Sequence, residues 1–151
     1  MRAIIALGAN LDEPAQNVEL AISILDQSTD LVERSSLYKT KPVGGPEQPD
    51  YVNAVCIVET QLPPHDLLHV LQGIEKSMGR VRDVKWGPRV IDCDLIAYDD
   101  FILDDEELTL PHPRAHERRF VLEPWLEIDP TAVLTGHGPV SAILAQLPLA
   151  E

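Results

Sequence analysis

The chain has 151 residues, of which 44% are hydrophobic and 25% are charged, as expected for one globular domain with its own core. Its formal net charge of −13 argues against a general nucleic-acid-binding protein, because phosphate attraction needs a basic surface. No segment approaches the length of a membrane span, and the apolar run after Met1 is too short for a signal peptide. Cys56 and Cys93 lie in apolar runs that predict buried free thiols. We therefore expect a single domain over residues 1–151, located in the cytoplasm.

Strand and helix patterns alternate in the first half of the chain. Three segments rich in aliphatic and β-branched residues predict strands: residues 2–7, 31–40 and 51–60. A helix is predicted over residues 12–27, because Val18, Ile22 and Leu25 recur on one helical face. Three prolines and two glycines within residues 41–50 predict a loop before the third strand.

The second half begins with a helix that opens on proline and stops at glycine, over residues 63–79. A charged loop, residues 80–89, then leads into a strand that contains Asp92 and Asp94. The resulting order β-α-β-β-α-β is the split unit of ferredoxin-like folds. A hairpin and a terminal helix near residues 139–147 follow. The sequence thus predicts an α+β fold, a single-domain ferredoxin-like βαββαβ core with an added hairpin and C-terminal helices.

Two aspartates interrupt the apolar strand. Because residues i and i+2 of a strand share a face, Asp92 and Asp94 stand side by side, about 7 Å apart along the backbone. The same alternation predicts that Ile96 and Tyr98 share their face. The opposite face, directed into the core, is expected to carry Ile91, Cys93, Leu95 and Ala97.

A carboxylate pair of this kind suits magnesium, which prefers a few hard oxygen ligands together with substrate phosphates. Two such ions would clamp a polyphosphate. The alternative is that both aspartates simply face solvent on an open sheet. Seven of the twelve Lys and Arg residues lie between Arg80 and Arg119, which favours the metal site, since carboxylates and guanidiniums together form a phosphoryl-transfer site. Neither a Walker lysine motif nor a protein-kinase glycine-rich loop is present in the sequence.

The segment KWGPRVIDCDLI closely resembles the signature of the 6-hydroxymethyl-7,8-dihydropterin pyrophosphokinase family. Further blocks in the family's order extend the resemblance over nearly the whole chain: LGAN, YKTKPVGGPEQPDYVNAV, IEKSMGRVR and LPHPRAHERRFVLEPWLEI. This family moves pyrophosphate from ATP to a pterin alcohol in folate biosynthesis. The resemblance implies that activity, with two magnesium ions and with ATP as co-substrate. It implies small-molecule pterin and ATP as partners, and neither nucleic acid nor membrane.

The resemblance also implies roles for single residues. Asp92 and Asp94 would each bind magnesium, and Arg80 and Arg89 would contact the transferred phosphates as catalytic residues. The positions that match nucleotide contacts are Gln72, Glu75, Arg82, Trp86, Leu95, Thr109, His112 and Arg118. The positions that match the pterin pocket are Thr40, Val43, Tyr51, Asn53 and Phe120. Tyr51 and Asn53 also fit on chemical grounds, because a flat pterin needs an aromatic face and an amide for its ring edge.

A few residues depart from the family pattern or stand apart from it. Cys93 replaces an aliphatic residue and is expected to be harmless in the core. Glu107 stands where some members carry a basic residue near ATP, and Pro113 where some carry tyrosine. His65 and His69 have the i, i+4 spacing of metal ligands but lack the glutamate of the zinc-protease pattern, so we interpret them as solvated helix residues.

Two other functions are consistent with the predicted fold. A ferredoxin-like module that senses a nucleotide or metal without turnover is expected to lack either the aspartates or the arginines, whereas both are present. An RNA-binding sheet needs surface aromatic residues on a basic face, which the acidic balance opposes. The sequence therefore predicts an ATP-dependent pyrophosphokinase.

Overall fold

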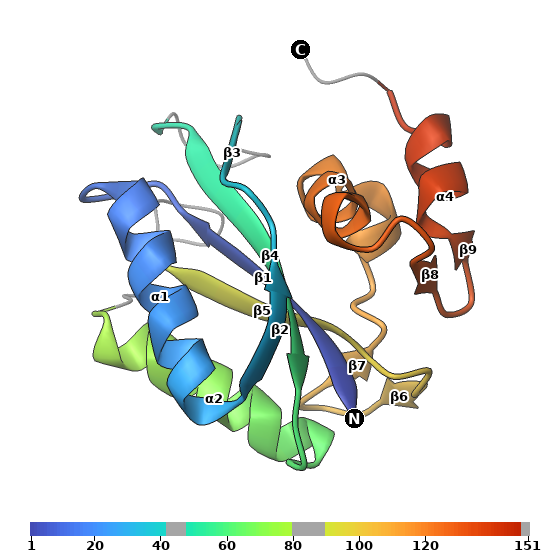
Figure 1. Ribbon diagram of the computed structural model, residues 1–151, viewed down its shortest axis with the longest axis horizontal. Coiled ribbons are helices and arrows are strands. Elements are labelled where there is room, and N and C mark those ends of the chain that lie inside the picture. The colour runs from blue at the N-terminus through green and yellow to red at the C-terminus, as the bar shows by residue number, and fades with distance from the viewer. Residues whose placement is uncertain (42–47, 80–89, 149–151) are drawn as a thin grey trace.

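The computed structural model describes residues 1–41, 48–79 and 90–148. Its centre is an antiparallel sheet with the strand order β2-β4-β1-β5, and β3 also pairs with β4 (Figure 1). The strands are β1 (Arg2–Ala9), β2 (Asp30–Arg34), β3 (Tyr38–Thr40), β4 (Tyr51–Glu59) and β5 (Asp92–Tyr98). If β2 and β3 are taken as one interrupted strand, this order is that of the split β-α-β unit. The predicted ferredoxin-like core is confirmed.

The segment predicted as a single strand over residues 31–40 is two strands in the structure. Arg34 pairs with Cys56 and Tyr38 pairs with Asn53, so four steps along one strand match three along β4. Ser35 fills the interruption: its N–H donates to the Val55 carbonyl, and its hydroxyl accepts the Val55 N–H, each at 2.9 Å. A buried serine thus replaces the ladder where the extra residue breaks it.

One face of the sheet is covered by α1 (Pro14–Ser28) and α2 (Pro64–Ser77), as Figure 1 shows. The apolar side chains of both helices pack on the same side of β1, β4 and β5 as Cys93 and Leu95. Gly79 follows α2 with a positive φ of 84°, a conformation that favours glycine, so the predicted stop of this helix is confirmed. None of the described helices is both long enough and apolar enough to cross a membrane.

The other face carries the C-terminal third of the chain, which gives three layers in all (Figure 1). Leu122 and Trp125 pack there against Val55, Ile57 and Ile96. The elements of this layer and of its connection to β5 are the hairpin strands β6 (Leu103–Asp104) and β7 (Thr109–Leu110), the 3-10 turn η1 (Ala115–Glu117), α3 (Arg119–Ile128), the strands β8 (Val133–Leu134) and β9 (Gly138–Pro139), and α4 (Val140–Gln146). The predicted hairpin and terminal helix are confirmed, whereas the short β8–β9 hairpin was not foreseen.

Strand β5 departs from simple alternation near its end. Ile4 pairs with Ala97 and Ile5 pairs with Leu95, so Ile96 is an extra residue that forms a β-bulge. Ile96 and Ala97 therefore both face α3, and Tyr98 returns to the core under α1 and α2. The predictions that Tyr98 shares the face of the aspartates, and that Ala97 shares the face of Cys93, are wrong for this reason. The bulge lies beyond Asp92 and Asp94, which keep the predicted alternation.

Candidate functional site

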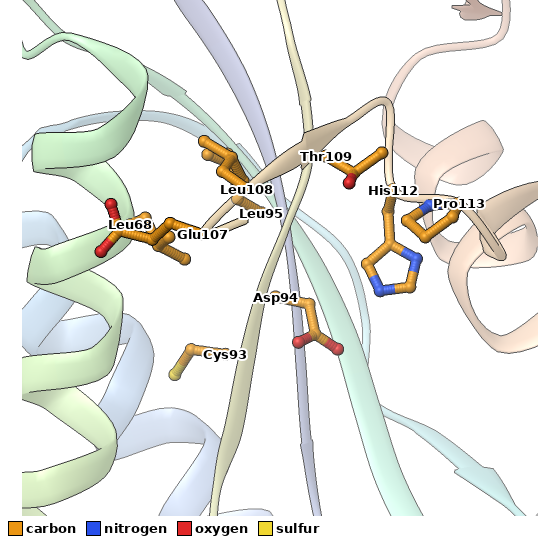
Figure 2. A pocket seen from close by; sticks show the side chains of 9 residues that line it. All are labelled: Leu68, Cys93, Asp94, Leu95, Glu107, Leu108, Thr109, His112 and Pro113. Carbon is orange, nitrogen blue, oxygen red and sulfur yellow. The ribbon is translucent and has the colours of Figure 1, made fainter. Parts of the chain in front are cut away.

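The two aspartates project from the same face of β5, the face toward α3. Asp92 pairs with Gly8 of β1 and Asp94 with Ala6, and both carboxylates are half-buried. Between them, Cys93 points to the core under the helices; Figure 2 shows Asp94 and Cys93 leaving β5 in opposite directions. Because glycine and alanine face them on β1, the carboxylates stand beside the smallest side chains of that strand.

A polar row crosses the sheet at Gly8. This glycine pairs with Asp92 on one side and with Asn53 of β4 on the other, and paired residues share a face. A Cβ at Gly8 would lie 2.6 Å from Asn53 Oδ1, closer than real contacts allow. The absence of a side chain at Gly8 therefore lets the Asn53 amide lie over β1, next to the strand that carries Asp92.

The donor chemistry fits magnesium. Within residues 1–41, 48–79 and 90–148, no group of three or more His, Cys, Asp or Glu is arranged to hold a metal ion. Two oxygen-donor side chains on one face are too few for a metal site made of protein alone. They suit an ion that completes its shell with water and substrate phosphates, which is how magnesium is commonly held.

Beside Asp94 lies a cavity of about 230 Å³ between α2, β5 and the segment that follows β6. Figure 2 shows its lining, which consists of Leu68, Cys93, Asp94, Leu95, Glu107, Leu108, Thr109, His112 and Pro113. Three of the predicted nucleotide positions, Leu95, Thr109 and His112, thus meet in one place. The three departures from the family pattern, Cys93, Glu107 and Pro113, lie in the same lining.

His112 is fixed by its backbone and by its ring. Its N–H donates to the Ile96 carbonyl at 2.8 Å, and its Nδ1 accepts the Arg114 N–H at 3.2 Å. Burial, followed by the charges of Arg118 and Arg114, lowers the pKa of His112 to about 4. At neutral pH the ring is therefore uncharged with its proton on Nε2, which makes that nitrogen a hydrogen-bond donor.

The predicted pterin positions on β3 and β4 also meet. Asn53 is 6% exposed, and its Nδ2 donates to the Thr40 hydroxyl. Thr40 in turn pairs with Tyr51 across the two strands. Phe120 lies at the start of α3, half-buried against the core on that side, with the Arg118 guanidinium 5.6 Å from its ring centre.

A carboxylate of α3 holds the strand that carries Thr40. Glu127 accepts hydrogen bonds from the Ser36 N–H, the Ser36 hydroxyl and the Tyr38 hydroxyl, at 2.8 to 3.2 Å. Burial together with this bond raises the pKa of Tyr38 to about 12. Sequence reasoning missed Glu127, because its partners lie some ninety residues away in the chain.

The remaining nucleotide positions are placed differently from one another. Gln72 is exposed on α2 and Arg118 is half-buried before α3. Glu75, also on α2, is 5% exposed, and its Oε2 accepts the Cys93 N–H at 2.9 Å. The other predicted site residues, Val43, Arg80, Arg82, Trp86 and Arg89, lie outside the described residues.

The two histidines of α2 are more than solvated side chains. His65 Nε2 lies 2.7 Å from an Asp105 carboxylate oxygen, and His69 Nε2 lies 2.7 Å from one of Glu107. The interpretation of these histidines as exposed is right for His69, but both are paired. The acidic run after β5, opposite two histidines at i, i+4 spacing, was the available signal. The bond to Glu107 raises the pKa of His69.

Comparisons with known proteins identify the family of the chain. The family model of 7,8-dihydro-6-hydroxymethylpterin-pyrophosphokinase (HPPK) matches residues 4–130. The chain is 46% identical over 147 residues to a 2-amino-4-hydroxy-6-hydroxymethyldihydropteridine pyrophosphokinase of Haemophilus influenzae, covering 96% of this chain and 89% of that protein. It is 39% identical over 149 residues to the protein of the same name from Pseudomonas aeruginosa, covering 97% and 92%.

Solved structures support the fold. The wild-type HPPK-DHPS of Plasmodium falciparum superimposes with a TM-score of 0.74 at 13% identity, over 96% of this chain. The match spans 44% of that longer chain, and at 13% identity it bears on the fold alone. With the family model and the relatives above, the family predicted from the sequence is confirmed. This chain belongs to the 7,8-dihydro-6-hydroxymethylpterin-pyrophosphokinase family.

Proposed function

We propose that the chain transfers pyrophosphate from ATP to the hydroxyl of 6-hydroxymethyl-7,8-dihydropterin and releases AMP, as an enzyme of folate biosynthesis. One observation carries the proposal: the aspartates lie between two differently built regions. Asp92 is separated from the Asn53 amide only by Gly8, and Asp94 lines the cavity that contains His112. A carboxylate pair in that position serves a reaction that joins a ligand of one region to a ligand of the other.

Each of the two regions contains side chains suited to binding one of the two ligands. The Asn53 amide, held by Thr40, would pair with the ring edge of the pterin, and Tyr51 and Phe120 would supply aromatic contact. In the cavity, the His112 Nε2 proton is available to a nucleotide oxygen, and Leu68, Leu95 and Leu108 supply apolar surface. The name of the family and the chemistry of these side chains both support a pterin and ATP as the two ligands.

Asp92 and Asp94 would hold two magnesium ions. When bound, the ions neutralise the phosphate charge and orient the chain of phosphates for in-line displacement. The pterin hydroxyl gives up its proton to solvent, and its oxygen forms a bond to the β-phosphorus. The bond from that phosphorus to the α-phosphate oxygen breaks, so AMP leaves. Arg80 and Arg89 remain predicted phosphate contacts.

The nucleotide product tests the proposal. The chain is incubated with ATP, magnesium and the hydroxymethyl pterin, and nucleotides and pterins are then separated. We expect AMP and pterin diphosphate in equal amounts, each dependent on both magnesium and pterin. ADP with a pterin monophosphate would refute the proposed transfer. Tight binding of both ligands with neither product would favour the sensing module. The cytoplasmic location stays a prediction.

A further inference from the structure

A buried carboxylate stands directly behind the aspartate pair. Glu75 lies on α2 and is 5% exposed, and its Oε2 accepts the backbone N–H of Cys93 at 2.9 Å. Cys93 is the residue between Asp92 and Asp94, so this bond holds the strand backbone between the two carboxylates. A polar side chain buried to this degree needs a hydrogen-bond partner, because burial without one is costly.

The Cys93 N–H needs an acceptor because of its place in the sheet. In an antiparallel ladder the N–H groups of successive residues point alternately toward the two edges. Among the described strands, β5 stands at the end of the order β2-β4-β1-β5 and pairs with β1 alone, along its inner edge. The N–H of Cys93 points to the outer edge, where Glu75 accepts it. A buried N–H left without an acceptor would cost the desolvation of that group.

Glu75 lies outside the described lining of the cavity. The described residues that line the cavity include Leu68 of α2 and residues 93–95 of β5, but not Glu75. The neighbouring Ile74 packs in the core with Cys93 and Leu95, which fixes α2 against the strand. The carboxylate is thus on the helix side of β5, while the aspartates project from the other face.

We infer that Glu75 is a positioning residue for the metal-binding strand: it anchors the Cys93 peptide and thereby sets the direction of Asp92 and Asp94. The inference rests on the proposed magnesium role of these aspartates. Removing a group that orients metal ligands without touching the metal commonly costs about 10- to 100-fold in metal affinity. A contact of Glu75 with the nucleotide, as the family resemblance implies, is a separate matter that the test must distinguish.

Two variants of Glu75 carry the test. Glu75→Ala removes the acceptor, whereas Glu75→Gln keeps an amide oxygen that can accept the same N–H. If the alanine variant does not fold, Glu75→Asp, whose carboxylate is one methylene shorter, replaces it. The matched control is Ile74→Ala, which removes core contacts of the same helix without touching the bond.

Two measurements test the inference, and neither depends on enzyme turnover. Hydrogen exchange followed by NMR reports protection of the Cys93 amide, and titration with Mn²⁺ in the presence of inorganic triphosphate reports the metal site. Triphosphate has neither ribose nor base, so a nucleoside contact cannot affect this titration. We expect Glu75→Ala to lose the Cys93 protection and to weaken Mn²⁺ binding about 10-fold, and Glu75→Gln to restore most of both.

Three results would overturn the inference. The first is unchanged Cys93 protection in Glu75→Ala. The second is unchanged Mn²⁺ and triphosphate binding together with weakened ATP binding, which would assign Glu75 to the nucleoside. The third is an equal loss in Ile74→Ala, which would indicate general loosening of α2. Failure of the proposed function would look different: the parent protein would form no AMP, but the protection of the Cys93 amide and the binding of Mn²⁺ with triphosphate could still be measured.

Discussion

Gly8 occupies the point where the two halves of the proposed reaction meet. It is flanked by Asn53 and Asp92, which belong to the predicted pterin and metal positions. Gly8 has an ordinary strand backbone, so glycine is needed here for its missing side chain and not for its conformational freedom. The Asn53 oxygen fills the place that a Cβ would take.

Replacing Gly8 by alanine tests this reading. The new Cβ would meet Asn53 Oδ1 at 2.6 Å, so the amide must turn away from the position that Thr40 fixes. We expect pterin affinity to fall by about 1–3 kcal/mol, the range for a lost hydrogen bond with desolvation. ATP affinity should change far less. Isothermal titration with each ligand measures both.

Gly73 supplies the matched control for that substitution. It lies exposed on α2, and a Cβ there meets nothing within 4 Å. Gly73→Ala should raise stability by about 0.5–1 kcal/mol, because a helix interior favours alanine, and should leave both affinities unchanged. Equal loss of pterin and ATP binding in Gly8→Ala would contradict the proposed role of this position.

The aspartates are tested by charge removal at constant shape. Asp92→Asn and Asp94→Asn should each reduce the rate of AMP formation about 100-fold or more, because the electrostatic support of the transferred group is lost. Both side chains are half-buried, so the urea midpoint should change little. The exposed Asp100→Asn is the control. Near-parental turnover of either variant at limiting magnesium would exclude the metal assignment.

At the scale of elements, α2 and the β6–β7 hairpin are joined by two histidine–carboxylate pairs. His65 bonds Asp105 and His69 bonds Glu107. Glu107 also lines the cavity, so this contact positions one wall of the proposed nucleotide site. His65 is half-buried and His69 is exposed, so both pairs are open to solvent and salt should weaken them.

The hairpin contact should therefore depend on pH. Because Glu107 raises the pKa of His69 above 6.5, the pair contributes fully below that value and is lost as pH rises through the raised pKa. We expect faster hydrogen exchange over residues 103–110 at about pH 8 than at about pH 6, after correction for intrinsic rates. His69→Gln should abolish this difference. A parent protein whose hairpin protection is independent of pH would show that the pair is not formed.

Helix α3 and strand β3 are joined in a different way, through Glu127. Glu127→Ala removes the acceptor of Ser36 and Tyr38, which should destabilise the fold by about 1–2 kcal/mol in urea. It should also lower the pKa of Tyr38 from about 12, although burial will keep it above 10. Absorbance titration measures this, with Tyr38→Phe to identify the signal. An unchanged titration in Glu127→Ala would show that the bond is absent in solution.

Periodicity predicted the order of the elements, because long apolar alternations and helical faces are local features of the chain. It failed where pairing with a neighbouring strand decides the outcome. Tyr98 was predicted on the wrong face because the bulge at Ile96 depends on pairing with β1. Residues 31–40 were predicted as one strand because the interruption at Ser35 depends on its hydrogen bond with Val55 of the neighbouring strand. The aspartate pair was predictable from spacing, but the row from Asp92 through Gly8 to Asn53 was not, since register is a tertiary property.

At the scale of the whole molecule, the sheet separates a layer that supports the structure from the face that carries the proposed site. The layer of α1 and α2 covers one face of the sheet and packs the core (Figure 1). Through Glu75 it also supports the aspartate strand from behind. The other face carries the aspartates themselves, Asn53 and the segment with His112. The proposed reaction therefore takes place on a face whose supports come from both layers.

The central claim is attack on the β-phosphorus of ATP, with AMP as the leaving group. The most direct measurement uses ATP that carries heavy oxygen in the bridge between the α- and β-phosphates, with the pterin and magnesium, and mass spectrometry of the products. We predict AMP that retains the label and pterin diphosphate that lacks it, because the bridge oxygen leaves with AMP. Label in a pyrophosphate product, or an ADP product that carries it, would contradict the account.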